Sequence, residues 1–239
     1  MQTSDTRNQD YMLYVQLPRG YEDPGNRHKH YPVIYLLDPY WDFPVVAGAR
    51  SGLVFDGIVP EYIVVGIGYS TQGQVEEGDV VNILRKIDYT PVRDASEPNT
   101  GDAAAFMSFI KSSVIPFVED SYRIADYRVF AGTSSGGLFS LYLMFENPGL
   151  FQGHIAIAPA VGYFHRWAFV KESLFYSADP VNGIDPSGRT LPTRLYMSVG
   201  SNDQMDNFTR ESIAFGELLK GREYEGLNFK FEVKQNEHH

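Results

Sequence analysis

Strand-length runs of apolar residues recur along this sequence, separated by segments with helical spacing. The runs Val33–Leu37 and Tyr62–Ile67 are apolar throughout, which is typical of strands covered on both faces. Further predicted strands are Tyr11–Leu17, Arg128–Ala131, Ile155–Ala158, Arg194–Val199 and Phe229–Val233. Helical spacing is seen at Phe106, Phe109, Ile110 and Phe117, at Phe139, Leu143 and Met144, and at Ile213, Phe215 and Leu218. This alternation predicts an α/β fold with a mostly parallel, doubly wound sheet and helices on both faces, rather than a sandwich or a bundle.

Composition narrows the class of protein. A chain of 239 residues with 43% hydrophobic residues fits one domain over residues 1–239. The net charge of −10 offers no basic excess for a nucleic acid or an acidic membrane surface, and the lack of cysteine excludes disulfides and thiolate catalysis. No apolar run approaches the roughly 18 residues of a membrane span. Because the first ten residues are too polar for a signal peptide, we expect a cytoplasmic protein or one exported with its signal peptide removed.

Two long stretches depart from the alternation. Residues Tyr69–Thr100 are polar and irregular, and residues 162–192 contain an aromatic cluster and a proline-glycine turn, so this second stretch is a candidate lid or insert. Loops of such length are usually functional or mobile, and both would leave the carboxyl ends of strands, where α/β sheets bind ligands. Pro116 is expected to kink or end the helix that contains Phe109.

The sequence Gly132-Thr133-Ser134-Ser135-Gly136 has the pattern G-x-S-x-G and lies between a predicted strand and a predicted helix. This is the setting of a nucleophile elbow, in which a sharp turn exposes a serine hydroxyl. The two glycines leave room for the neighbouring backbone. Ser134 is the candidate nucleophile, because Ser135 has Thr133 instead of glycine two positions before it. The alternative is a glycine-rich turn in which Ser134 only caps the helix.

A serine nucleophile needs a histidine base that a carboxylate orients. In α/β hydrolases the acid follows the serine and the histidine follows the acid. After the strand that ends at Val199, Asp203 is the first choice for the acid and Asp206 the reserve, although Asp203 could also be a helix cap or turn residue. Four of the six histidines precede this acid, which leaves His238 and His239. The alternative for this pair is the remnant of an expression tag.

Serine hydrolases stabilise the oxyanion with two backbone N–H groups, each worth about 3 kcal/mol. One is expected from Ser135, directly after the nucleophile. The other is expected from the loop after the strand that ends at Leu37. Because Pro39 has no N–H, Tyr40 or Trp41 must supply this donor, and Tyr40 comes first by position.

Several motifs occur in one order over nearly the whole chain. Tyr14–Tyr21 resembles an opening strand with "LPxGY", Tyr31–Asp38 resembles "YPVLYLLDG", Phe109–Arg123 resembles "FIxxEVIPFIExxYR", Gly132–Gly137 resembles "GxSxGG", and Gly149–Phe151 resembles "PxLF". Together they resemble the esterase D family of α/β hydrolases, which includes siderophore (enterochelin) esterases, feruloyl and acetylxylan esterases, S-formylglutathione hydrolases and mycolyltransferases. The "YLLD" and "IPFIE" elements are most similar to the siderophore-esterase-like branch.

The resemblance implies an α/β-hydrolase fold with Ser134 as nucleophile, Asp203 as acid, and Ser135 and Tyr40 as oxyanion donors. It also implies a base in the element after the last strand, where it favours His239 over His238. The sequence departs from the family twice. Pro39 stands where glycine is usual, which is expected to stiffen the loop, and the sequence stops at the histidines, before the closing helix of the family.

These observations predict a serine carboxylic-ester hydrolase that acts on a small-molecule ester through an acyl-enzyme, without a metal or organic cofactor. The substrate pocket is expected to use aromatic residues near strand ends, namely Trp41, Tyr163 and Trp167. Packing of a lid is an equally open role for them. Two other functions stay open: a non-catalytic ligand- or carbohydrate-binding member of the fold, and an acyltransferase. The sequence predicts neither the natural ester nor the oligomeric state.

Overall fold

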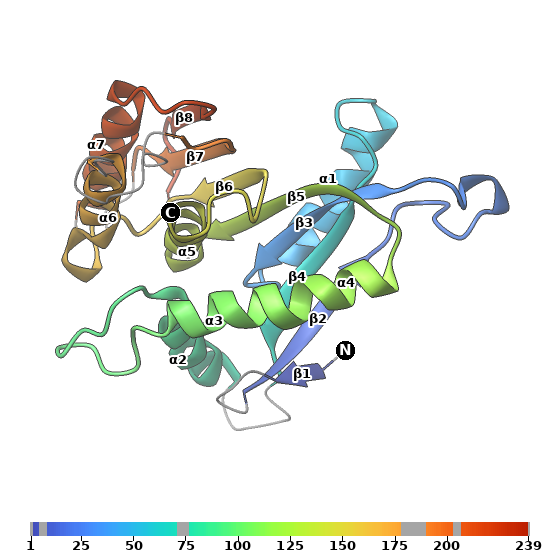
Figure 1. The fold of residues 1–239 in the computed structure, drawn as a ribbon, viewed down its shortest axis with the longest axis horizontal. Coiled ribbons are helices and arrows are strands. Elements are labelled where there is room, and N and C mark those ends of the chain that lie inside the picture. The colour runs from blue at the N-terminus through green and yellow to red at the C-terminus, as the bar shows by residue number, and fades with distance from the viewer. Residues whose placement is uncertain (1, 5–8, 71–76, 178–189, 203–206, 239) are drawn as a thin grey trace.

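The structure is a computed structural model that describes residues 2–4, 9–70, 77–177, 190–202 and 207–238. Within these residues an eight-stranded sheet has the order β1-β2-β4-β3-β5-β6-β7-β8 (Figure 1). The strands are β1 (Gln2–Ser4), β2 (Asp10–Gln16), β3 (Tyr31–Leu37), β4 (Ile63–Tyr69), β5 (Ile124–Thr133), β6 (Gly153–Ile157), β7 (Arg194–Gly200) and β8 (Asn228–Lys234). The pairs β1–β2 and β2–β4 are antiparallel, and the other pairs are parallel. The predicted mostly parallel α/β sheet is confirmed.

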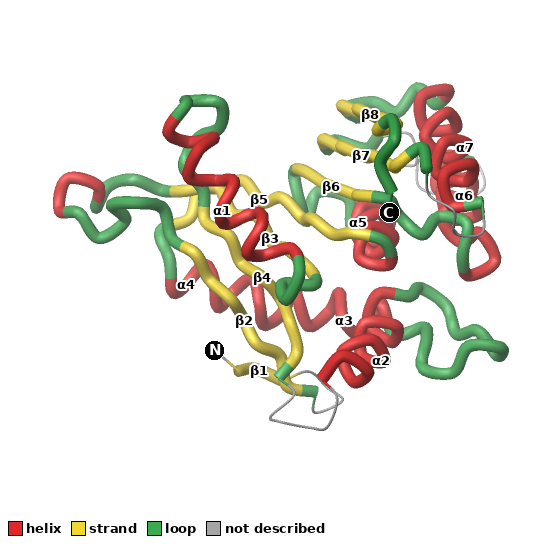
Figure 2. Tube along the Cα trace, turned by 180° about the vertical axis from the view of Figure 1, so that it is seen from behind, coloured by secondary structure: helices red, strands yellow, loops and turns green. Residues whose placement is uncertain are grey.

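Helices cover both faces of the sheet. They are α1 (Asp42–Phe55), α2 (Glu77–Tyr89), α3 (Ala103–Phe109), α4 (Ile115–Ser121), α5 (Ser135–Glu146), α6 (Trp167–Tyr176) and α7 (Phe208–Gly221). Figure 2 shows α1 in front of one face, whereas the long α3–α4 run lies behind the other. In β3, Ile34 and Leu36 line a cavity with α1, whereas Tyr35 belongs to a core cluster with α3 and α5. The sheet is therefore covered on both faces, as predicted.

The helical run from α3 to α4 changes character just before Pro116. A π-helical segment, Ile110–Val114, separates the two α-helices, and Pro116 lies in the first turn of α4. Because proline has no N–H and its ring crowds the preceding turn, a regular α-helical bond cannot form there. The predicted interruption thus appears as a π-helical segment, after which the helix continues to Ser121.

Helix α5 links the two parts of the hydrophobic core. Every residue of α5 from Gly136 to Phe145 is buried. Phe139 and Leu143 pack in the cluster formed with β2, β3 and β4, whereas Leu138 and Met144 pack in the cluster formed with β7 and α7. A helix that is apolar all round is held by contacts on every side. The turn that precedes α5 is consequently anchored to the centre of the molecule.

The stretch Tyr69–Thr100, which the sequence presents as polar and irregular, contains a regular helix. Residues 77–89 form α2, which contacts both α3 and α5. Its apolar residues Val81 and Leu84 are three positions apart and pack towards the core. The interpretation of this stretch as one long loop is therefore wrong, and α2 brings its last turns to the carboxyl edge of the sheet.

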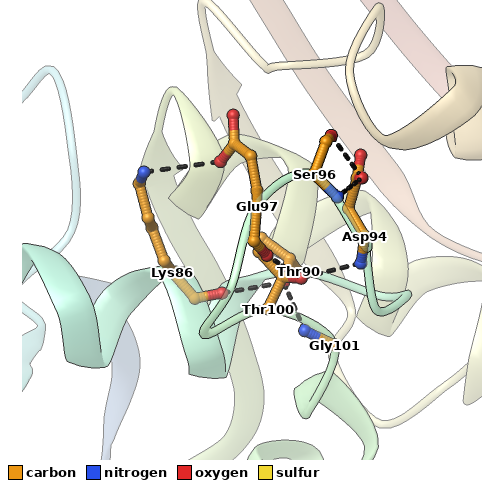
Figure 3. Close-up of polar contacts among 7 residues, drawn as sticks. All are labelled: Lys86, Thr90, Asp94, Ser96, Glu97, Thr100 and Gly101. Carbon is orange, nitrogen blue, oxygen red and sulfur yellow. Dashed lines mark hydrogen bonds and ion pairs between the residues drawn. The ribbon is translucent and has the colours of Figure 1, made fainter.

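The connection from α2 to α3 is closed by its own hydrogen bonds (Figure 3). The Thr90 hydroxyl donates to the carbonyl of Lys86 at 2.7 Å and accepts from the N–H of Gly101 at 2.7 Å. Further along, the N–H of Asp94 donates to the Thr100 hydroxyl at 2.9 Å. These contacts join the two ends of the connection, so the end of α2 is held in place.

The candidate lid, residues 162–192, is described only in part. A short helical turn, Phe164–Arg166, leads into α6, which contacts α5. Glu172 on α6 is fully buried and accepts hydrogen bonds from Arg222 and Tyr224. Residues 178–189 lie outside the described residues. The described part is thus packed on the helical layer, and its role as a lid stays a prediction.

Candidate active site

The turn from β5 into α5 holds Ser134 in a strained conformation. Its φ of 59° and ψ of −119° lie outside the regions that residues with side chains normally occupy. Ser134 directly follows β5, at the carboxyl end of the strand that lies between β3 and β6. Its side chain is partly exposed. This is the geometry of a nucleophile elbow, at the edge where α/β sheets bind ligands.

Small residues and backbone hydrogen bonds support this turn. A Cβ on Gly132 would lie 2.5 Å from the backbone carbonyl of Gly136, so no other residue fits there without a shift of the backbone. The N–H of Ser134 donates to the carbonyl of Ile157 at 2.9 Å, and its carbonyl accepts from the N–H of Ala160 at 3.1 Å. The strained residue is therefore fixed to the end of β6.

Ser134 does not act as a helix cap. Its side chain makes no capping hydrogen bond to α5, which contradicts the alternative role considered from the sequence. Ser135 is the first residue of α5, and the first N–H groups of a helix have no partner within the helix. These groups also form the positive end of the helix dipole, which favours negative charge. The Ser135 N–H thus has the location that an oxyanion donor next to Ser134 requires.

The loop after β3 contains Tyr40 and Trp41, the two candidates for the second donor. The N–H of Trp41 donates to the carbonyl of Asp38 at 3.1 Å and closes a turn, which favours Tyr40 as the donor. The Tyr40 hydroxyl donates to the carbonyl of Tyr69 at 2.5 Å and accepts from its N–H at 2.6 Å. The side chain of Tyr40 is thus fixed to the end of β4.

Two glycines of β4 make room for Pro39 and Tyr40. A Cβ on Gly66 would lie 2.7 Å from Cβ of Pro39. A Cβ on Gly68 would lie 2.8 Å from Cγ of Pro39 and 3.0 Å from the Tyr40 hydroxyl oxygen. Both distances are shorter than a normal contact between heavy atoms. The proline that departs from the family pattern is therefore accommodated because β4 has no side chains at these positions.

The acid and one candidate base lie beyond what the structure describes. Asp203, Asp206 and His239 are outside the described residues, so their roles stay predictions. The segments next to them are hydrogen-bonded to each other, since the N–H of Asn202 donates to the carbonyl of Glu237 at 2.9 Å. The loop after β7 and the segment after β8 therefore meet at the carboxyl edge of the sheet.

His238 lies on this junction. Its Nδ1 donates to the carbonyl of Asn202 at 3.0 Å, because a carbonyl oxygen can only accept. In the neutral ring this leaves Nε2 as the proton acceptor. The side chain is exposed, and no hydrogen bond among the described residues joins it to Ser134. His238 thus has the tautomer that a base requires but is not seen in contact with the nucleophile.

A second serine-histidine pair is present but is buried. The ring of His154 lies 3.2 Å from the Ser140 hydroxyl and is 3% exposed. Burial lowers the pKa of His154 to about 3. Ser140 lies within α5, with no backbone strain, and is fully buried. This pair is buried in the core and closed off from a substrate, in agreement with the chain-order argument that excludes His154 as the base.

The predicted aromatic pocket residues differ in their surroundings. Trp41 is 52% exposed beside the Tyr40 loop. Trp167 is partly buried with its ring 5.3 Å from that of Tyr142 on α5, and the Tyr163 ring lies 6.1 Å from that of Phe208 on α7. Packing thus accounts for part of the roles of Tyr163 and Trp167, whereas Trp41 is the most exposed of the three.

Asp42 connects α1 to the elbow. Its carboxylate accepts a hydrogen bond from the hydroxyl of Thr133, directly before Ser134, at 3.1 Å. Burial raises the pKa of Asp42, and the hydrogen bond from Thr133 opposes this effect. Both residues line a cavity of about 220 Å³ whose other walls are mostly aliphatic. Sequence patterns did not single out this contact, because an aspartate at the start of a helix is common.

The sequence patterns also miss Arg85, whose guanidinium pairs with Asp38 at 2.7 Å beside the Tyr40 loop.

Within the described part of the chain, no group of three or more His, Cys, Asp or Glu side chains is arranged to hold a metal ion. No helix in that same part is both long and apolar enough to cross a membrane.

Comparison with known proteins adds family information to this geometry. The model of a family described as "Putative esterase" matches residues 4–239. Ferri-bacillibactin esterase BesA of Bacillus subtilis (strain 168) is 30% identical over 221 residues, which cover 85% of this chain and 70% of that protein. Siderophore triacetylfusarinine C esterase of Aspergillus fumigatus is 28% identical over 163 residues, which cover 65% of this chain and 53% of that protein. The chain thus spans only about half the length of this second relative.

A solved structure has the same fold. The siderophore hydrolase EstB from Aspergillus nidulans matches with a TM-score of 0.82 and 23% identity, covering 100% of this chain and 88% of that chain. The parallel sheet and the elbow at the carboxyl end of β5 define an α/β hydrolase. The chain belongs to the esterase family whose model spans it and is an esterase enzyme. Because the relatives are siderophore esterases, the resemblance to the siderophore-esterase-like branch is confirmed.

Proposed function

We propose that this chain hydrolyses carboxylic esters of siderophores, with Ser134 as nucleophile in a Ser-Asp-His triad. The observation that carries the proposal is the strained backbone of Ser134 between a central strand and the buried helix α5. A strained residue persists only where its surroundings hold it, and such residues cluster at active sites. The substrate class is extended from the triacetylfusarinine C esterase and from an enterobactin esterase of Emericella nidulans, both of which are named as siderophore esterases.

The reaction has two halves. Oγ of Ser134 attacks the ester carbonyl while Nε2 of the terminal histidine takes its proton, and the N–H groups of Ser135 and Tyr40 stabilise the oxyanion. The tetrahedral intermediate then collapses, and the histidine returns the proton to the leaving alcohol. Water attacks the acyl-enzyme with the same histidine as base and releases the acid and free Ser134. Asp203 orients the histidine and stays ionised throughout.

Hydrolysis of p-nitrophenyl butyrate tests the nucleophile. Ser134→Ala should lower kcat by about 10³-fold or more, because the remaining groups cannot form an acyl-enzyme. Ser112→Ala is the matched control, because the Ser112 hydroxyl is exposed on the π-helical segment between α3 and α4 and is not part of the elbow. A fluorophosphonate should add one phosphonyl group to the wild type and to Ser112→Ala, but not to Ser134→Ala. Turnover that survives Ser134→Ala, or a folded wild type without an adduct, would support a non-catalytic binding module.

The base is tested by comparing His238→Ala with His239→Ala. The variant that loses turnover while the other keeps it identifies the base, and we expect His239 from the resemblance. Loss of activity in neither variant would contradict a triad completed by the terminal segment. Product analysis with an added acceptor alcohol separates hydrolysis from acyl transfer by partitioning, because a hydrolase releases mainly free acid in water whereas a transferase passes most acyl groups to the alcohol.

A further inference from the structure

The carboxylate of Asp38 is buried at the end of β3. Asp38 is 3% exposed and has a left-handed backbone with φ of 50°. Its carbonyl accepts hydrogen bonds from the N–H groups of Trp41 and Asp42 at 3.1 and 3.2 Å. A buried charge is costly unless it is paired and hydrogen-bonded. This one must therefore be compensated by specific partners.

The partners come from one turn of α2. Arg85 donates from Nε to Oδ1 of Asp38 at 3.0 Å and from Nη2 to Oδ2 at 2.7 Å, and the Tyr89 hydroxyl donates to Oδ1 at 3.2 Å. Burial lowers the pKa of Arg85, but the hydrogen bonds and charge of Asp38 outweigh it, so the net shift of this pKa is upward. The guanidinium lies 5.7 Å from the ring centre of Trp41. The guanidinium is thus charged, and its two-bond contact with the carboxylate, the fork, has a fixed direction.

The position of the carboxylate connects both halves of the proposed oxyanion hole. Asp38 lies two residues before Tyr40, which supplies one N–H. A Cβ on Gly136 would lie 3.5 Å from Oδ2 of Asp38, so the carboxylate also lies against the residue that follows Ser135. Asp38 therefore bonds the loop with one donor through its backbone carbonyl, and its carboxylate lies against the first turn of the helix with the other donor. Helix α2 holds the same carboxylate from a third direction.

We propose that the Arg85–Asp38 pair, assisted by Tyr89, is a positioning device for the oxyanion hole, which keeps the Tyr40 N–H aligned with the Ser135 N–H. This inference rests on the proposed esterase function. A buried ion pair adds little to stability compared with well-packed apolar residues, but its bidentate geometry is directional. That directionality is what a donor pair needs, since a misplacement of about 1 Å can cost roughly 100-fold in rate.

The chain contains a matched control for this arrangement. Arg222 donates from Nε and Nη2 to the fully buried Glu172 at 2.9 and 3.2 Å, and the Tyr224 hydroxyl donates to the same carboxylate at 2.8 Å. The chemistry is the same fork plus tyrosine, but it joins α6 to the connection between α7 and β8. Loss of this second fork should weaken the fold without moving the oxyanion donors.

The test compares Arg85→Met with Arg222→Met on p-nitrophenyl butyrate. Arg85→Met should lower kcat by about 10- to 100-fold with KM changed less than about threefold, because the donors act on the transition state. The inhibition constant of butylboronic acid, which forms a tetrahedral adduct on the serine, should rise by a similar factor. Arg85→Lys should recover part of the loss, since lysine restores the charge but not the fork. Arg222→Met should lower the melting temperature while kcat stays within about twofold of the wild type.

Three results overturn the inference. They are a folded Arg85→Met with wild-type kcat, a loss of kcat in Arg222→Met as large as in Arg85→Met, or a loss in kcat without any change in boronate affinity. If Arg85→Met does not fold, Tyr89→Phe replaces it, with an expected fall in kcat of about threefold to tenfold, and an unchanged kcat overturns the inference. Ser134→Ala is measured alongside. Turnover that survives Ser134→Ala refutes the proposed function itself, whereas its loss together with a fully active Arg85→Met refutes only the positioning role.

Discussion

Gly68→Ala provides a direct test of where the second oxyanion donor lies. Gly68 is in β4 and takes no part in the proposed chemistry. The loop that contains Pro39 and Tyr40 packs into the space where Gly68 has no side chain. A methyl group there would lie 2.8 Å from Cγ of Pro39 and 3.0 Å from the Tyr40 hydroxyl oxygen. Because Gly68 lies in the pairing between β2 and β4, the strand cannot easily move away. The loop must move instead.

The size of the effect follows from these distances. Comfortable contacts between heavy atoms begin near 3.5 Å, so the loop must shift by roughly 0.5 to 0.7 Å. The Tyr40 hydroxyl, which now bonds both backbone groups of Tyr69, would be pushed off this anchor. A donor displaced by a large part of 1 Å loses much of its value, which corresponds to a fall of about 10- to 50-fold in kcat/KM, or roughly 1.4 to 2.3 kcal/mol.

The assay is p-nitrophenyl butyrate turnover combined with a melting curve. Gly153→Ala is the control, because its Cβ would meet Cγ2 of Val129 at 3.2 Å at the start of β6, at the opposite end of that strand from the elbow. We expect both variants to fold, and only Gly68→Ala to lose activity. A folded Gly68→Ala with wild-type kcat/KM would refute the reasoning that the Pro39–Tyr40 loop carries a donor. Equal losses in both variants would refute it as well, because they would indicate a general response of the sheet.

Three further predictions follow from the same geometry. Gly132→Ala should give little soluble protein or a collapsed elbow without fluorophosphonate labelling, because its Cβ would lie 2.5 Å from the backbone of Gly136. For His154, the folded pKa of about 3 lies below the ordinary value of about 6.5, so its contribution to stability is complete above pH 6.5 and is lost as the pH falls towards 3. Urea unfolding at pH 7 and pH 5 should show a loss of about 2 kcal/mol that the double variant Ser140→Ala/His154→Leu lacks, and equal losses in both proteins would contradict the assignment. Pro39→Gly should lower the free energy of unfolding by about 0.4 to 1 kcal/mol, because glycine gives the unfolded chain more freedom. Urea unfolding measures this change, and an unchanged free energy of unfolding would contradict the idea that Pro39 stiffens the loop.

The strands of the parallel sheet were predictable because burial on both faces leaves an uninterrupted apolar run. The runs at Val33–Leu37 and Tyr62–Ile67 became β3 and β4, displaced by only a few residues at their ends. Strand β1 escaped prediction, since three residues are too few to form a pattern. The elbow was predictable because its backbone segments lie so close together that Gly132 has no room for a side chain next to Gly136. This close contact is visible in the sequence as the two glycines of G-x-S-x-G.

The positioning network was beyond the reach of these patterns. Helix α2 carries Arg85, yet the stretch around it is polar enough to be interpreted as a loop. The apolar residues Val81 and Leu84 alone report its buried side, and tertiary contacts with α3 and α5 supply the rest. The pairing of Arg85 with Asp38 joins residues 47 positions apart. No local rule connects them, so only the fold shows that a charge in this stretch compensates one beside the oxyanion loop.

Chain topology brings the segments that carry the predicted acid and base to one edge of the sheet, whereas the roles of the individual residues stay predictions. Strands β7 and β8 are parallel neighbours, so the segments that follow them must open on the same edge of the sheet. The hydrogen bond from Asn202 to Glu237 is the direct result of this neighbourhood. Topology does not choose between His238 and its neighbour, because one step along an irregular segment can turn a side chain towards the sheet or away from it. The Nδ1 bond of His238 to Asn202 orients its ring beside the segment that leads to Asp203. If His238 were the base, productive binding would have to exchange this carbonyl partner for the Asp203 carboxylate, whereas His239 as base could leave the bond intact and use it to hold the segment in place.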